Sequence, residues 1–110
     1  MPSCINKVFL LAPISKYGVS LKYAPSGTAC AEFSLVLTEQ GQDGKYFSRL
    51  APCQVWGRRA EAVSDLEPGQ LCLFEGKVAS RRKGENDWET VFSGFDVTPI
   101  VAAAAEQVAP

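Results

Sequence analysis

Residues 29–39 read ACAEFSLVLTE, and this stretch decides the fold class. Apolar and polar residues alternate along it: Ala31, Phe33, Leu35 and Leu37 share one parity, and Glu32, Ser34 and Thr38 share the other. A period of two is typical of a β-strand with one buried face and one solvated face. The sequence therefore predicts a half-buried strand over residues 29–39.

The sequence on either side of this stretch predicts two further strands. Upstream, INKVFLLAPI at residues 5–14 is rich in branched and aromatic residues, and the turn KYAPSGT at residues 22–28 follows it. Downstream, the hairpin turn QDG at residues 42–44 leads into KYFSRLAPCQVWG at residues 45–57. Pro52 in that segment cannot donate a ladder hydrogen bond, so we expect an edge or a bulge there.

The second half of the chain predicts one helix and then two strands. The helix is RRAEAVSDLE, residues 58–67, which carries a modest apolar stripe and stops at Pro68 and Gly69. The strands are LCLFEGKVASRR, residues 71–82, and WETVFSGFDVTPI, residues 88–100, joined by the turn KGEND.

This order of elements predicts an all-β domain over residues 1–100. Few helices separate the strands, so the sheet should be antiparallel, and five strands of this length usually curl closed and lose their exposed edges. We expect a five-stranded antiparallel barrel with the one short helix between strands three and four. The Ala-rich residues 101–110 are expected to form a short flexible tail.

The composition weighs against an enzyme. The chain has no histidine, which removes Ser-His and Cys-His catalysis and most general bases that work at neutral pH. Its 4 cysteines are widely spaced and form no C-x-x-C pair, so we expect free thiols that pack as small hydrophobes. The sequence therefore predicts a non-enzymatic protein without a metal or another cofactor.

The sequence shows no membrane or export signal. No apolar run approaches the length of a bilayer span, and the run at residues 8–14 lacks a basic flank and a cleavage site. We therefore expect a cytoplasmic protein without a membrane partner. The net charge is −1, so any binding of nucleic acid must come from local basic clusters.

Several segments carry a family resemblance. INKVFLLAPI followed by LKYAPSGTACAEFSLVL, then CQVWGRRAE, then LEPGQLCLFEGKVASR resemble bacterial single-stranded DNA-binding proteins in their order and spacing. The match covers roughly residues 5–98. It implies an OB-fold that usually assembles as a homotetramer. Apolar faces on the first and fifth predicted strands also favour contact between subunits, so we expect a homotetramer, or a dimer if the interface is reduced. The resemblance also implies sequence-independent binding of single-stranded DNA in replication, recombination or repair, through stacked aromatics and phosphate contacts.

The resemblance and the residues together select candidate nucleic-acid contacts. Trp56 aligns with a stacking aromatic of the family and has outward parity relative to Val55; the alternative is a core tryptophan. Arg81 matches a family arginine, and the basic cluster Lys77, Arg81, Arg82 and Lys83 lies beside Trp88; the alternative is a solvated hairpin. The other candidates are Tyr46, which opens the third strand, Arg58, Lys7 and Lys22; a plain surface position suits both lysines equally well.

The chain also departs from the family pattern. Leu50 and Pro52 stand where the family typically has a stacking tryptophan and a basic residue, and Lys83 stands where a tryptophan is common. We therefore expect weaker DNA binding than is typical. The alternative function is an OB-fold adaptor within a replication or recombination complex, with weak or lost DNA binding.

The end of the chain differs as well. The family commonly ends in a flexible acidic tail that recruits partners, but this chain ends in EQVAP without an acidic cluster. Either that recruiting function is missing, or the chain is cut short.

Overall fold

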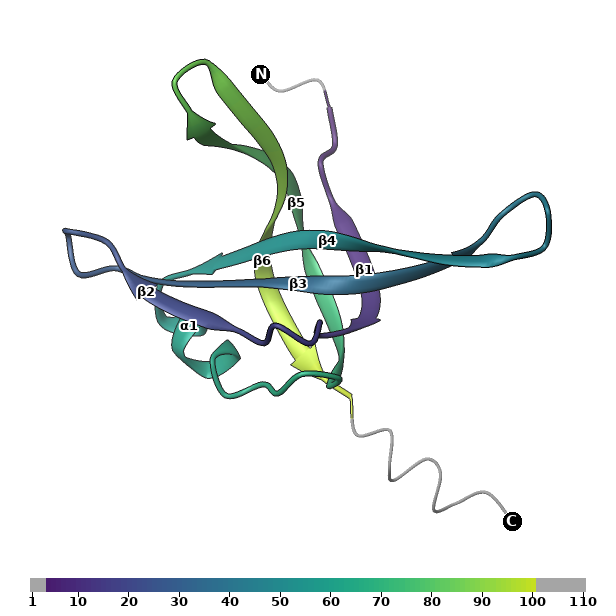
Figure 1. The fold of residues 1–110 in the computed structure, drawn as a ribbon. Helices are drawn as coiled ribbons and strands as arrows, with labels where there is room; N and C mark the ends of the chain where they lie inside the picture. Colours follow the sequence, from purple (N-terminus) through teal and green to yellow (C-terminus); the bar gives the residue numbers. More distant parts are fainter. Residues whose placement is uncertain (1–3, 101–110) are drawn as a thin grey trace, which may run out of the picture.

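The computed structural model describes residues 4–100, which form a curved sheet and a short helix (Figure 1). In chain order the elements are β1 (Val8–Pro13), β2 (Ser20–Tyr23), β3 (Ala29–Gln40), β4 (Tyr46–Trp56), α1 (Arg58–Val63), β5 (Leu71–Gly84) and β6 (Asp87–Pro99). The predicted tail at 101–110 lies outside the described residues, as do residues 1–3.

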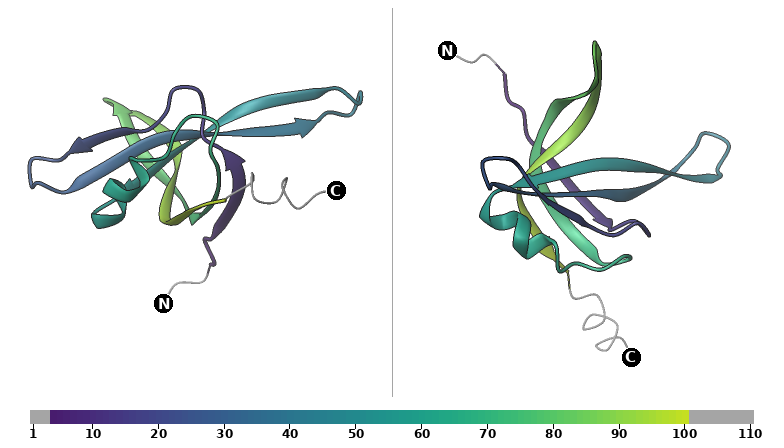
Figure 2. Two further views of the ribbon diagram at one scale, coloured as in Figure 1. Left: turned by 90° about the horizontal axis from the view of Figure 1, so that it is seen from below. Right: turned by 60° about the vertical axis from the view of Figure 1, so that its left-hand side comes forward.

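The strands form a single sheet in the order β1-β5-β6-β4-β3-β2. Its two ends, β1 and β2, are consecutive in the chain, so the segment between them links the two edges of the sheet. In this link Ile14 forms an antiparallel bridge with Leu35, and the Ser15 amide donates a 2.9 Å hydrogen bond to the Ser34 carbonyl. The sheet therefore wraps around the core, as Figure 2 shows from two further sides. The predicted all-β class is confirmed, and the one short helix lies between β4 and β5, which are the third and fourth of the five predicted strands.

Three details differ from the sequence prediction. Residues 20–23 pair with β3 as an added short strand, because the tight turn is confined to residues 24–28, where the Ala24 amide bonds to the Thr28 carbonyl. β4 and β6 pair in parallel over a short stretch. They can run in the same direction because α1 and β5 lie between them in the chain and β5 runs in the opposite direction. The helix ends at Val63, after which hydrogen bonds spaced three residues apart tighten the backbone toward Pro68.

The core lies on the inner face of the barrel, where the odd-numbered residues of β3 and β4 meet β5 and β1. Its aromatic centre is the edge-to-face pair Phe33 and Phe74, with ring centroids 6.4 Å apart. A β-carbon on Gly94 would lie 2.8 Å from the Phe74 ring and 2.9 Å from Val55, so only glycine lets β6 approach this closely. The alternation read from residues 29–39 therefore gives the correct buried face.

The cysteines are all free thiols, as predicted. Cys30, Cys53 and Cys72 are buried, whereas Cys4 is exposed and does not pack in the core. Burial raises the pKa of the Cys53 thiol to about 12, so this thiol stays protonated at neutral pH. Residues 4–100 hold no cluster of three or more Cys, Asp or Glu side chains that could bind a metal ion. The short helix described in this range is not long or apolar enough to cross a membrane.

Candidate nucleic-acid interface

The even-numbered residues of β3 and β4 form one continuous surface, which we call the outer face. Cross-strand pairing places Trp56 opposite Cys30, Gln54 opposite Glu32 and Pro52 opposite Ser34, and the surface continues to Tyr46 on the projecting hairpin. Trp56 is 48% exposed although Val55 beside it is buried, so the predicted outward orientation is confirmed. The outer face therefore offers aromatic rings near both ends of β4, about 33 Å apart at the usual rise of a strand.

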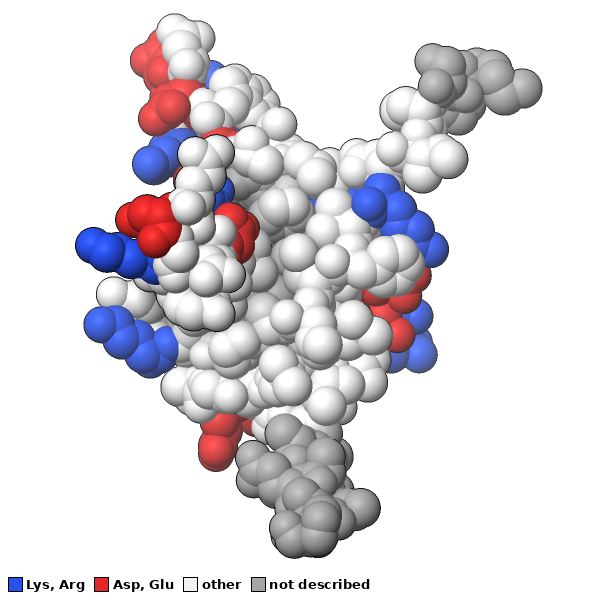
Figure 3. Space-filling view, turned by 90° about the vertical axis from the view of Figure 1, so that its right-hand side faces the viewer, with Lys and Arg blue, Asp and Glu red and all other residues white. Residues whose placement is uncertain are grey.

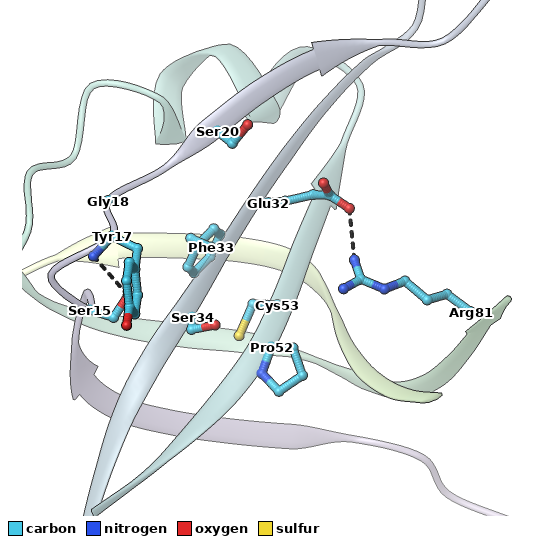
Figure 4. A pocket seen from close by; sticks show the side chains of 10 residues that line it. All are labelled: Ser15, Tyr17, Gly18, Ser20, Glu32, Phe33, Ser34, Pro52, Cys53 and Arg81. Carbon is cyan, nitrogen blue, oxygen red and sulfur yellow. Dashed lines mark hydrogen bonds and ion pairs between the residues drawn. The ribbon is translucent and has the colours of Figure 1, made fainter. Parts of the chain in front are cut away.

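A pocket of about 230 Å³ opens on this face, between the link from β1 to β2 and the side chain of Arg81 (Figure 4). Its lining combines hydroxyl, aromatic and charged groups from Ser15, Tyr17, Gly18, Ser20, Glu32, Phe33, Ser34, Pro52, Cys53 and Arg81. This pocket lies beside the strand pair that carries Trp56, so a ligand on the outer face can reach both.

A chain of ion pairs crosses the edge of the pocket. The Lys22 ammonium lies 2.9 Å from Glu32, and the Glu32 carboxylate accepts a 2.7 Å hydrogen bond from Arg81. The Arg81 guanidinium also donates to Glu89, its cross-strand neighbour in β6. Two cations therefore face two carboxylates, and this part of the outer face carries no net positive charge.

A family model described as Single-strand binding protein family matches residues 5–98, which is most of the chain. The chain belongs to this family. It is 33% identical over 101 residues to "Single-stranded DNA-binding protein 1" of Streptococcus pyogenes, covering 89% of this chain and 74% of that relative. It is 32% identical over 109 residues to "Single-stranded DNA-binding protein 2" of Listeria monocytogenes, covering 96% of this chain and 65% of that relative.

A solved structure gives the same result for the fold. A deletion mutant of the single-stranded DNA-binding protein from Thermus aquaticus matches with a TM-score of 0.73 and 26% identity. The match covers 87% of this chain and 50% of the Thermus chain, so this family member spans about half of that protein. The OB-type fold predicted from the sequence is therefore confirmed, although the sheet has six strands and is not closed, so β1 and β2 remain at its edges.

The β5–β6 hairpin splits the predicted basic cluster between two faces. Arg81 pairs with Glu89, whereas the next pair along the ladder is Arg82 with the exposed Trp88. Adjacent residues on a strand point to opposite faces, so Arg82 and Trp88 lie on the side away from Arg81. Lys83 is exposed at the register shift that follows Arg82, and Lys77 has the parity of Arg81. Trp88 and Trp56 therefore do not form a single platform within one protomer.

The remaining predicted contacts lie at separate places around the barrel. Arg58 is exposed in the first turn of α1, two residues after Trp56. Lys7 precedes β1, where its ammonium lies 3.0 Å from Glu75 and 5.2 Å from the centre of the Phe9 ring. Lys22 forms an ion pair with Glu32, which lines the pocket. Contact of each of these residues with nucleic acid stays a prediction.

Arg81 is the one residue of the pocket lining that the sequence predicted as a contact, and Glu32 and Tyr17 are two lining residues that it missed. Glu32 lies 49 residues from Arg81 in the chain, so nothing local in the sequence indicates their pairing. Tyr17 follows Lys16 in a segment without strand alternation, and only the fold brings it to the outer face. Both residues could be found only from the way the strands pair, and a single sequence does not specify pairing between residues so far apart.

We expect Glu32→Gln to tighten binding of a single-stranded oligonucleotide about twofold to fivefold. The substitution removes a carboxylate that competes with phosphate for Lys22 and Arg81, and charge interactions at partly exposed sites amount to roughly 0.5–1 kcal/mol. The measurement is a fluorescence anisotropy titration at low salt. The control is Glu61→Gln, which removes the same charge from the exposed side of α1. Equal tightening by both variants, or weaker binding by Glu32→Gln, contradicts local competition at Arg81.

Proposed function

We propose that this protein binds single-stranded DNA without selecting base sequence, and that the strand lies along the outer face of β3 and β4. The observation that carries this proposal is the exposed Trp56 at the end of that face, in a chain of the single-strand binding family. A half-exposed indole presents a flat ring to any base, and every base has a π-face, so stacking there does not depend on sequence.

The proposed phosphate contacts come from basic residues that make no ion pair within residues 4–100. Arg58, Lys77, Arg82 and Lys83 are exposed and have no carboxylate within salt-bridge distance in that range. Lys7, Lys22 and Arg81 are already paired with carboxylates, so phosphate must displace those carboxylates to gain full charge compensation. This arrangement supports binding with a modest electrostatic contribution.

The test is a titration of fluorescein-labelled oligo(dT) with the protein at several salt concentrations. Four phosphate contacts per protomer predict a slope of about −3 for log K against log salt, because each contact on a single strand contributes about −0.7. Oligo(dC) and oligo(dA) should bind within about tenfold of oligo(dT). The absence of saturable binding at low salt contradicts the proposal.

The ion pairs also support a second candidate function, an OB-fold adaptor with weak or lost DNA binding. Lys22 and Arg81 are neutralised, and Leu50 and Pro52 replace a stacking and a basic position of the family pattern. The same titration separates the two functions, since an adaptor leaves oligo(dT) unbound even at low salt.

We also propose self-association through the edge strand β1. Phe9, Leu11 and Leu73 are exposed on the outside of the β1–β5 pair, and β1 has a free edge in the sheet order. Exposed apolar side chains beside an unpaired strand edge favour pairing with a second copy. Figure 3 views the molecule from one side, where uncharged surface runs down the middle between mixed acidic and basic margins. A homotetramer, or a dimer if the interface is reduced, is the assembly we expect.

The proposed cellular role follows from these properties. A non-enzymatic coat on single-stranded DNA serves replication, recombination and repair, in which duplex DNA is opened. Such a role requires a cytoplasmic location at the nucleoid, and it needs no metal or cofactor, since stacking and charge supply the binding energy.

A further inference from the structure

Tyr17 is an exposed aromatic residue that the backbone holds in place. It lies in the tight turn from Ser15 to Gly18, where the Gly18 amide donates a 3.0 Å hydrogen bond to the Ser15 carbonyl. The Tyr17 amide donates a 3.4 Å hydrogen bond to the hydroxyl of Ser15, whose side chain is buried. Gly18 has φ of 72°, a conformation that glycine adopts without strain. The Tyr17 ring, 74% exposed, is therefore presented to solvent from an ordered turn.

The Tyr17 ring forms one wall of the pocket on the outer face (Figure 4). Ser34 and Pro52, paired across β3 and β4, line the pocket with it, and the Glu32–Arg81 ion pair lies at the opposite end. The pocket, about 230 Å³, is large enough for one planar nucleobase. A base that stacks on Tyr17 can direct its polar edge toward serine, glutamate and arginine groups, which match the donors and acceptors of base edges.

We propose that Tyr17 is a base-stacking residue and that this pocket holds one nucleobase of bound single-stranded DNA. The loop between the first strands is a ligand-binding element in OB-folds, and Tyr17 supplies there an aromatic surface that Leu50 and Pro52 do not supply on β4. The Lys16 ammonium, 5.4 Å from the centre of the Tyr17 ring, adds a positive charge beside the pocket. This inference rests on the proposed DNA binding and extends its path from Trp56 across the outer face to Tyr17.

The experiment compares Tyr17→Ala and Tyr17→Phe with the wild-type protein in the oligo(dT) titration. Tyr17→Ala should weaken binding about fivefold to tenfold, the lower end of the range for one base–aromatic stack, and Tyr17→Phe should bind within about twofold of wild type. The matched control is Tyr23→Ala. Tyr23 is also exposed, but it has the parity of Ala29 and does not line the pocket, so its loss should leave affinity unchanged.

A second measurement does not depend on a variant. Oligonucleotides carrying 5-iodouracil should cross-link to wild-type protein on irradiation, and the peptide that contains Tyr17 should carry the modified base. If the wild-type protein binds oligo(dT), but Tyr17→Ala binds equally well and this peptide carries no cross-link, the Tyr17 assignment is wrong and the proposed DNA binding still holds. If the wild-type protein does not bind oligo(dT), the proposed function fails and the Tyr17 assignment fails with it.

Discussion

Trp56→Ala should weaken oligo(dT) binding about fivefold to 150-fold. The indole is 48% exposed at the end of β4, and one base–aromatic stack contributes roughly 1–3 kcal/mol. If the ring stacks on DNA, its fluorescence should also be quenched as oligonucleotide is added. Anisotropy gives the affinity of the variant, and emission from a Trp88→Ala protein, in which Trp56 is the remaining tryptophan, reports contact directly.

A thermal melt of the same variant separates binding from folding. An interior tryptophan typically costs about 3–5 kcal/mol of unfolding free energy when it is truncated to alanine, and half-exposed Trp56 should cost clearly less. Trp88→Ala removes the other exposed indole, which lies beside Arg82 on the opposite face of the β5–β6 hairpin, so its affinity reports whether the DNA strand also reaches that face. Near-normal DNA affinity with a large drop in melting temperature would remove Trp56 from the interface.

Most of the fold can be predicted from local pattern, because strands and turns leave short-range signals. The alternation from Ala31 to Leu37 identifies the buried face of β3, and the boundaries of β4 at Tyr46 and Trp56 lie within one residue of the expected segment. β2 is missed because SLKY is only four residues long and precedes a turn rich in proline and glycine. A strand that short is stabilised by its pairing with β3, which is a tertiary contact.

The candidate site is less predictable, because it depends on which faces the barrel brings together. Clustering in the sequence groups Arg81, Arg82 and Trp88, but the strand pleat sends Arg81 to one face and Arg82 with Trp88 to the other. The two carboxylates that neutralise Arg81 come from β3 and β6 and are equally absent from the local pattern. Sequence composition thus identifies charged segments, whereas the net charge of the site requires the fold.

On β1, too, the sequence predicts the strand but not which of its side chains are exposed. The hydrophobic segment VFLLAP is predicted as a strand from composition alone, but its parity decides which residues enter the core. Leu10 packs against the core, whereas Phe9 and Leu11 point outward beside Leu73. The proposed contact with a second copy would bury these exposed apolar side chains.

Leu11→Glu should halve the assembly at micromolar concentration, from tetramer to dimer or from dimer to monomer. Leu11 is 62% exposed in the protomer and pairs with Leu73 on the outside of β1 and β5. In a twofold-symmetric interface each subunit contributes one introduced glutamate. Two carboxylates are then buried near each other, and each loses several kcal/mol of hydration free energy. Light scattering after size-exclusion chromatography gives the mass of each species, and a change from tetramer to dimer, or from dimer to monomer, is the expected result.

The control is Leu50→Glu, which makes the same change at an exposed leucine on the outer face of β4. It should leave the mass of the assembly unchanged, while any loss of DNA affinity appears only in the oligo(dT) titration. Leu50→Glu should melt near the wild-type temperature, because Leu50 does not belong to the buried core, whereas Leu11→Glu should melt lower by the amount that assembly stabilises the protomer. A wild-type protein that is monomeric at micromolar concentration contradicts the β1 interface outright. Dissociation by Leu50→Glu but not by Leu11→Glu instead assigns the contact between copies to the outer face, where it would compete with DNA.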